Sequence, residues 1–169
     1  SFDLDPAKTI VGSRMRIERN PAMPAGPLRL HGEGLNLLRV LADGESVSFR
    51  EETGSLIIDN PPAADSFTLE IRNTCAPEKN SELSGLYTSG GGFYTQCEAE
   101  GFRRISYFLD RPDVMAVYTV LLRADKAKYP VLLSNGNLVE QGDLDNGRHY
   151  AKWHDPFPKP SYLFALVAA

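Results

Sequence analysis

Hydrophobic and polar residues alternate with a period of two along much of the chain. Between Ser13 and Glu18, Met15 and Ile17 fall on one side of an extended backbone, and the charged residues fall on the other. Phe67–Arg72 alternates in the same way. A period of two is typical of β-strands with one buried and one solvated face, so both segments are predicted to be strands of this kind.

Two apolar runs predict strands of the hydrophobic core. Val114–Leu122 could be a buried helix by its period alone, but its β-branched residues and the flanking Pro112 and Asp125 favour a central strand. Ser161–Ala169 also has the composition of a core strand, and the chain stops inside it. Because natural chain ends are usually polar and loosely held, we expect the sequence to be part of a longer protein.

Turn signals separate the strands. Asp43–Gly44, Asn135–Gly136 and Asn146–Gly147 are dipeptides that tolerate the positive φ of tight hairpin turns. No segment has the pattern of a long helix, and no internal repeat is visible. Many short strands with frequent turns predict an all-β fold, either a sandwich or an open multi-sheet domain. The length fits a single domain that spans residues 1–169.

Composition and charge narrow the possible partners. Hydrophobic residues make up 42% of the chain and charged residues 24%, which argues against disorder. The formal net charge is −4 and no Lys/Arg cluster occurs, so no nucleic-acid partner is expected. The first residues do not form a signal peptide, and the longest apolar run is too short to span a bilayer. We therefore expect a soluble, cytoplasmic protein with no membrane partner.

The residues that usually carry catalysis are sparse. Cys75 and Cys97 are too few for a disulfide framework and are expected to be free, reduced thiols. His149 and His154 lie five residues apart in a segment rich in Gly, Trp and Pro, whereas a helical zinc motif needs two histidines four apart. No nucleophile elbow, P-loop or dinucleotide-binding motif occurs. No metal site and no catalytic residue are therefore expected in this chain.

One segment could carry chemistry. If Thr95–Glu100 is extended, Gln96, Glu98 and Glu100 share one face, opposite a face of small, nearly apolar residues. Two carboxylates on one face repel each other unless a cation lies near them. The pattern fits a solvated strand face paired with Arg103 or Arg104, and it also fits a site for a cationic ligand such as an ammonium group. The residues alone leave both interpretations open.

Two further strings have structural interpretations. Asp110–Asp113 is predicted to form a turn with an internal ion pair. Trp153 and Asp155–Pro158 are predicted to form a rigid aromatic–proline corner that packs on a sheet. A sugar-binding or proline-motif role for Trp153 is the alternative.

Long, ordered strings of this chain closely resemble the bacterial aminopeptidase N family of gluzincin-type (M1) metallopeptidases. The strings cover most of residues 85–168: Gly85–Tyr87, Thr95–Ile105, Tyr107–Val114, Ala124–Lys126, Tyr129–Asn137, Gly147–His149 and Asp155–Ala168. The first 84 residues resemble the family more loosely, through Phe2–Asp5, Pro27–Leu30 and Gly32–Glu33. Two departures are that Ala169 stands where the family usually has Gly, and that the family has an initial strand ahead of Phe2.

The resemblance implies the N-terminal β-domain of a longer enzyme that removes N-terminal residues from peptides. The implied fold is a multi-sheet, saddle-like β-sandwich, mostly antiparallel with some mixed pairing. In the family a thermolysin-like catalytic domain of the same chain holds a zinc ion through an HExxH pair and a later glutamate, and a GxMEN loop helps to grip the substrate amine. None of these elements occurs here. The resemblance thus implies zinc in the parent enzyme, none bound by this fragment, and an inactive isolated fragment.

The resemblance also assigns roles to residues of this chain. By position, Glu98 would bind the α-ammonium group of the peptide substrate, and Gln96 would line the pocket for the first side chain. Glu100 and Arg103 are candidates for a supporting role: Glu100 would either brace Glu98 or pair with Arg103, and it is not expected to be catalytic. Two other hypotheses remain open: a stand-alone β-sandwich that binds a sugar or peptide around Trp153 and Tyr162, and a structural domain whose acidic strip docks onto another domain.

Overall fold

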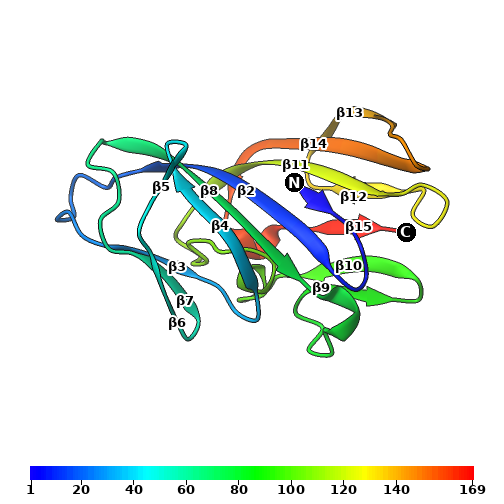
Figure 1. Cartoon of the computed structure of the whole chain (residues 1–169). Helices are drawn as coiled ribbons and strands as arrows, with labels where there is room; N and C mark the ends of the chain where they lie inside the picture. Colours follow the sequence, from blue (N-terminus) through cyan, green and yellow to red (C-terminus); the bar gives the residue numbers. More distant parts are fainter.

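The protein is built almost entirely of β-strands. Figure 1 shows a computed structural model that describes all of residues 1–169, with fifteen strands. The helical elements are three single-turn 3-10 helices: η1 (Pro77–Lys79), η2 (Phe102–Arg104) and η3 (Ser161–Leu163). The predicted all-β class is confirmed, and no helix of the domain is long and apolar enough to cross a membrane.

An eight-stranded mixed sheet forms the largest layer. Its strands, in spatial order, are β13 (Asn137–Asp143), β14 (Arg148–Lys159), β11 (Ala116–Asp125), β1 (Phe2–Asp3), β2 (Thr9–Glu18), β8 (Ser66–Cys75), β4 (Asn36–Ala42) and β5 (Glu45–Ser46). All neighbours are antiparallel except β1 and β11, which are parallel. The predicted mixture of mostly antiparallel pairing with some parallel pairing is therefore confirmed.

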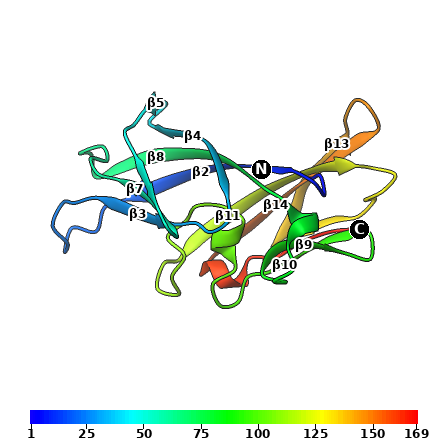
Figure 2. The ribbon, with the colours of Figure 1, turned by 60° about the horizontal axis from the view of Figure 1, so that its bottom comes forward.

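Two smaller sheets lie against opposite halves of the large one (Figures 1 and 2). The four-stranded sheet has the order β12 (Leu132–Ser134), β15 (Leu166–Ala168), β10 (Gly92–Gln96) and β9 (Gly85–Ser89). The three-stranded sheet has the order β3 (Leu28–His31), β7 (Ser55–Ile58) and β6 (Arg50–Glu52). The layers make the multi-sheet arrangement that the family resemblance implied.

Each small sheet encloses its own hydrophobic core. The larger core lies between the large sheet and the four-stranded sheet, with Phe93, Leu122 and Leu166 among its fully buried side chains. The smaller core lies against the three-stranded sheet and includes Leu30 and Leu69. Met15 and Ile17, predicted to face inward, pack against this smaller core from β2. The segment that follows β10 runs from the first core to the second.

Two of the three predicted hairpin turns are confirmed. Asp43 and Gly44 have φ of 50° and 79° between β4 and β5, and Asn146–Gly147 joins β13 to β14 with φ of 60° and 71°. Asn135–Gly136 instead connects β12 and β13, which lie in different sheets. The Asn135 side chain accepts a hydrogen bond from the backbone N–H of Ala165 at 2.8 Å. The hairpin prediction is wrong here because this amide fastens the turn to the chain after η3.

The apolar runs are strands with different limits from those predicted. Val114–Leu122 is confirmed as a strand inside the large sheet, although β11 begins at Ala116. Ser161–Ala169 is not one strand, because η3 precedes β15 and the Phe164 N–H donates to the Ser161 carbonyl at 3.0 Å. The predicted corner at Asp155–Pro158 is also wrong, since these residues belong to β14.

A bulge explains how β14 accommodates two prolines. Ala116 pairs with Lys159 and Tyr118 with Asp155, so Pro156–Pro158 lies opposite the single residue Val117. Proline has no N–H to donate to a sheet and is tolerated where pairing is interrupted. The bulge therefore accommodates both prolines, and β14 does not end at them.

Candidate functional site

The candidate site lies on a tight turn directly after β10. The strand ends at Gln96, and Glu98–Gly101 forms a turn. The Gly101 N–H donates to the Cys97 carbonyl at 2.8 Å, and the Glu98–Ala99 peptide bond is cis. The expectation that Thr95–Glu100 is one extended strand with a shared acidic face is therefore wrong. The chain closes on itself after Gln96, and its acidic side chains project from a turn.

Two glycines allow the turn to pack closely. A Cβ on Gly101 would lie 2.2 Å from the Gln96 carbonyl oxygen and 2.9 Å from the Cys97 Cα. Gly85, at the start of β9, has φ of +82°, and a Cβ there would lie 2.8 Å from the Cβ of Arg104. Contacts under about 3 Å to backbone atoms force the backbone to move, so no larger residue fits at Gly101 without displacing the turn.

Cys97 anchors the start of the turn in the larger core. Its side chain is buried in the larger core, and burial together with the nearby Asp110 charge raises the pKa of the thiol to about 12. Cys75 is also a free thiol, and burial raises its pKa to about 12. Both cysteines are free, as predicted. Because the nucleophilic form of cysteine is the thiolate, these raised pKa values do not fit a nucleophilic role at neutral pH.

Glu98 projects into solvent without a partner. Its side chain is exposed, and no hydrogen bond or ion pair of the domain reaches its carboxylate. Gln96 is exposed beside it, and its Nε2 donates to the Glu98 backbone carbonyl at 3.2 Å. Two other carboxylates do have cationic partners. Glu100 lies 3.6 Å from an Arg103 nitrogen, and Glu33 lies 3.5 Å from an Arg104 nitrogen. Glu98 is thus the carboxylate on this turn that is free to accept hydrogen bonds from a bound cation.

Arg103 has a stronger partner than the predicted one. The Arg103 Nε lies 2.8 Å from Asp110 Oδ2, and only 1% of the Asp110 side chain is exposed. The expected Glu100–Arg103 contact exists at 3.6 Å, but Glu100 is 71% exposed. The predicted ion pair inside the Asp110–Asp113 turn is confirmed for Arg111 and Asp113, at 3.1 Å. The sequence did not reveal the buried Asp110, because no local pattern separates it from the turn residues that follow it.

The histidines do not form a metal site. His149 and His154 both belong to β14, where a spacing of five residues directs their side chains to opposite faces. His149 Nε2 lies 2.7 Å from the Tyr129 carbonyl, and His154 Nδ1 lies 2.8 Å from Thr119 Oγ1. No three His, Cys, Asp or Glu side chains converge anywhere in the domain. The residues present therefore do not fit a zinc ion.

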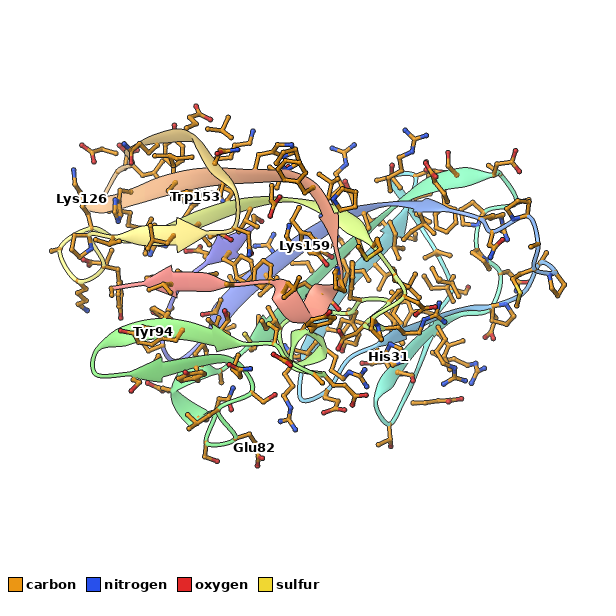
Figure 3. All side chains as sticks on the ribbon, turned by 180° about the vertical axis from the view of Figure 1, so that it is seen from behind. His31, Glu82, Tyr94, Lys126, Trp153 and Lys159 are labelled. Carbon is orange, nitrogen blue, oxygen red and sulfur yellow. The ribbon has the colours of Figure 1, made fainter.

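The main hollows of the domain lie away from the turn. Five hollows with volumes between 120 and 460 Å³ lie on other parts of the domain, and none of these is lined by Gln96, Glu98 or Glu100. Trp153 lines none of them either. Its Nε1 donates to the Leu132 carbonyl at 3.0 Å and its ring packs on the larger core, which favours a structural role (Figure 3).

Comparison with known proteins decides the family. The model of the Peptidase M1 N-terminal domain matches residues 1–163. The chain is 55% identical over 169 residues to aminopeptidase N of Escherichia coli K12 and 49% identical to that of Haemophilus influenzae. The chain belongs to the Peptidase M1 N-terminal domain family. Each comparison covers 99% of this chain but only 19% of the relative, so this M1 domain spans about a fifth of the length of these relatives.

Solved structures share the fold of this M1 domain. Legionella pneumophila aminopeptidase A, in complex with aspartic acid, superposes with a TM-score of 0.91 at 37% identity, over 95% of this chain and 19% of that one. An M1 zinc metallopeptidase of Deinococcus radiodurans, bound to a Tyr-Ser-Ala substrate, gives a TM-score of 0.83 at 18% identity, over 96% of this chain and 38% of that one. The second likeness shows the fold alone.

Replacement of Gly101 by alanine tests whether the turn of this M1 domain needs its close packing. We expect Gly101→Ala to lower the free energy of unfolding by about 1–3 kcal/mol, because the added methyl group meets backbone atoms. Chemical denaturation of the domain measures the change. Gly26→Ala is the control, since no atom lies within 4 Å of its added Cβ. Equal stability of the two variants would contradict the packing argument.

Proposed function

We propose that this domain works as the N-terminal part of a longer zinc aminopeptidase, in which Glu98 binds the α-ammonium group of the peptide substrate. The observation that carries the proposal is the exposed, unpartnered Glu98 on a closely packed turn, in a domain 55% identical to an aminopeptidase N. Gln96 is also exposed and donates to the Glu98 backbone carbonyl, and it would line the pocket for the first side chain of the substrate.

The chemistry of an exopeptidase explains why a free carboxylate is useful here. An ammonium group offers three N–H donors and a full positive charge, and a carboxylate accepts such bonds more strongly than a neutral group does. A peptide with a blocked N-terminus lacks the charge and would be rejected. Because Glu98 is exposed, the catalytic domain of the same chain could cover it, which would exclude water and strengthen the ion pair.

The zinc ion required by the proposed activity is not assigned to this domain. Its histidines are separated and hydrogen-bonded within the fold, and no cluster of ligands converges. In the proposed enzyme, the ligands of the metal belong to the remaining part of the longer protein. The contribution of this domain is to recognise the substrate amine.

Activity of the isolated domain tests whether hydrolysis requires the remaining part of the longer protein. Purified residues 1–169 are expected to show no hydrolysis of an aminoacyl p-nitroanilide, because the domain has no residues that fit a zinc site. The full-length parent is expected to hydrolyse it, to lose activity with a chelator and to regain activity with zinc. Thermal unfolding of the domain checks that it is folded in the assay. Zinc-dependent hydrolysis by the domain alone, or an inactive full-length parent, would contradict the proposal.

A structural docking role is the second candidate, and one surface feature favours it. Exposed apolar side chains border a hollow of about 460 Å³ between β2 and β11, with Met115 and Val117 55% and 50% exposed. Such a surface is suited to contact with another domain. Under this role alone, loss of the Glu98 carboxylate would leave activity per folded molecule unchanged.

A further inference from the structure

A buried ion pair lies behind the turn that carries Glu98. Asp110 Oδ2 accepts hydrogen bonds from both the backbone N–H and the Nε of Arg103, at 3.2 and 2.8 Å. Arg103 Nη2 also donates to the Asp110 backbone carbonyl at 2.9 Å. The side chains are 12% and 1% exposed, so both charges are largely withdrawn from water. Two of these three hydrogen bonds come from the guanidinium and fix its orientation.

Asp110 also binds the surrounding elements. Its second carboxylate oxygen, Oδ1, accepts a hydrogen bond from Ser161 Oγ at 2.5 Å, which joins it to η3. Its backbone N–H donates to His31 Nδ1 at 3.2 Å, which joins it to the end of β3. Figures 1 and 2 show η3 next to the loop that contains η2, near the junction of the small sheets. Asp110 thus connects three segments that are distant in the sequence.

Arg103 links the Asp110 ion pair to the turn that carries Glu98. It is the second residue of η2, and the N–H of the next residue, Arg104, donates to the Gly101 carbonyl at 3.0 Å. The Arg103 carbonyl accepts from the Glu33 N–H at 2.9 Å, and its Nη1 lies 3.6 Å from Glu100. The last residue of the turn and the ion pair are therefore held by one short helix.

We propose that Asp110 is a positioning residue: through Arg103 it holds the turn after β10 so that Glu98 meets the substrate ammonium. The inference rests on the proposed function of Glu98. A buried ion pair is a poor source of stability compared with apolar packing, because both charges must be desolvated. Its advantage at this place is geometric, since a ligand-binding carboxylate must be held within a fraction of an ångström. Asp110 itself is buried and does not touch the substrate.

A double-mutant cycle in the full-length parent enzyme tests the proposal. The variants are Glu98→Gln, Asp110→Asn and the double variant, and kcat and KM are measured with an aminoacyl p-nitroanilide. Asp110→Asn is expected to lower kcat/KM by about tenfold, mainly through KM, as loss of a supporting contact behind a binding group typically does. In the Glu98→Gln background the same change is expected to cost less than about twofold, because the carboxylate it positions is absent.

The outcomes separate this inference from the proposed function. If Glu98→Gln leaves kcat/KM unchanged, the proposed function fails. If Glu98→Gln impairs activity but Asp110→Asn costs the same factor in both backgrounds, or has no effect on KM, only the positioning role is overturned. Asp113→Asn is the matched control, because Asp113 lies in the same turn, is 72% exposed and pairs with Arg111. It is expected to leave both constants unchanged.

Ser161→Ala provides a milder variant in case Asp110→Asn does not fold. It removes one hydrogen bond to Asp110 and keeps the ion pair with Arg103. KM is expected to rise by about twofold to threefold in the wild-type background and not in the Glu98→Gln background. An unchanged KM, or an equal rise in both backgrounds, would overturn the positioning role.

Discussion

In the proposed full-length aminopeptidase, Glu98→Ala is expected to remove about 2–4 kcal/mol of transition-state stabilisation, which lowers kcat/KM about 30- to 900-fold. The Glu98 carboxylate is exposed and free of partners in the domain, so its removal breaks no contact of the fold. The loss instead falls on the bound substrate, whose ammonium group would be left without its counter-charge. Steady-state kinetics with a free-amine substrate measure the effect.

Stability and a neighbouring carboxylate serve as controls for this result. The free energy of unfolding is expected to stay within about 0.5 kcal/mol for Glu98→Ala, because the side chain is exposed and makes no hydrogen bond or ion pair. Glu100→Ala removes a charge from the same turn, where Glu100 is 71% exposed and lies 3.6 Å from Arg103. It is expected to change kcat/KM by less than about threefold. Equal losses for Glu98→Ala and Glu100→Ala would show a general charge effect in place of specific recognition.

Phe93→Ala is expected to lower the free energy of unfolding of the domain by about 3–5 kcal/mol, or its Tm by about 6–20 °C. Phe93 lies in β10, is 0% exposed, and its ring centroid is 4.9 Å from that of Tyr129. Loss of the ring leaves a cavity in the larger core, directly below the strand that leads into the Glu98 turn. Chemical and thermal denaturation of residues 1–169 measure the cost.

Phe157→Ala is the matched control for the cavity. It deletes the same side chain from β14, where Phe157 is 75% exposed. The expected change is within about 0.5 kcal/mol, because a ring already in water gains little from the fold. Similar losses for Phe93→Ala and Phe157→Ala would contradict the placement of the core between the large sheet and the four-stranded sheet.

The strands were predictable because their signal is local. In β2, Met15 and Ile17 alternate with charged residues, and this period of two survives in the fold since one face packs on the smaller core. The Asp43–Gly44 turn was predictable for the same reason, as both residues adopt positive φ between adjacent strands. Wherever neighbouring residues alone decide the conformation, the pattern indicated the structure.

The shape of the candidate site was not predictable, because close backbone packing decides it. Gln96, Glu98 and Glu100 alternate as they would in a strand, and three positions cannot distinguish a strand from a turn. The turn depends on Gly101 packing against the backbone of Gln96, Cys97 and Gly85, and such contacts leave no periodic signal in the sequence. The identity of the candidate residues came from the family resemblance, and their conformation came from the structure.

The buried polar contacts escaped prediction in the same way. Asp110 reads as a turn residue, yet its partner Ser161 is 51 residues away. The Asn135–Gly136 dipeptide reads as a hairpin, yet the Asn135 side chain binds Ala165, 30 residues away. A side-chain hydrogen bond across such separations leaves no periodic signal in the sequence. Through Ser161 and Ala165, these contacts hold the C-terminal segment against Asp110 and against the turn between β12 and β13.

The position of the α-nitrogen of a bound amino acid, in a crystal structure of the full-length enzyme, tests the central claim most directly. The account predicts that a Glu98 carboxylate oxygen lies within about 3.2 Å of that nitrogen, at hydrogen-bond distance. An α-nitrogen held entirely by other groups, with the Glu98 carboxylate more than about 5 Å away, would contradict it.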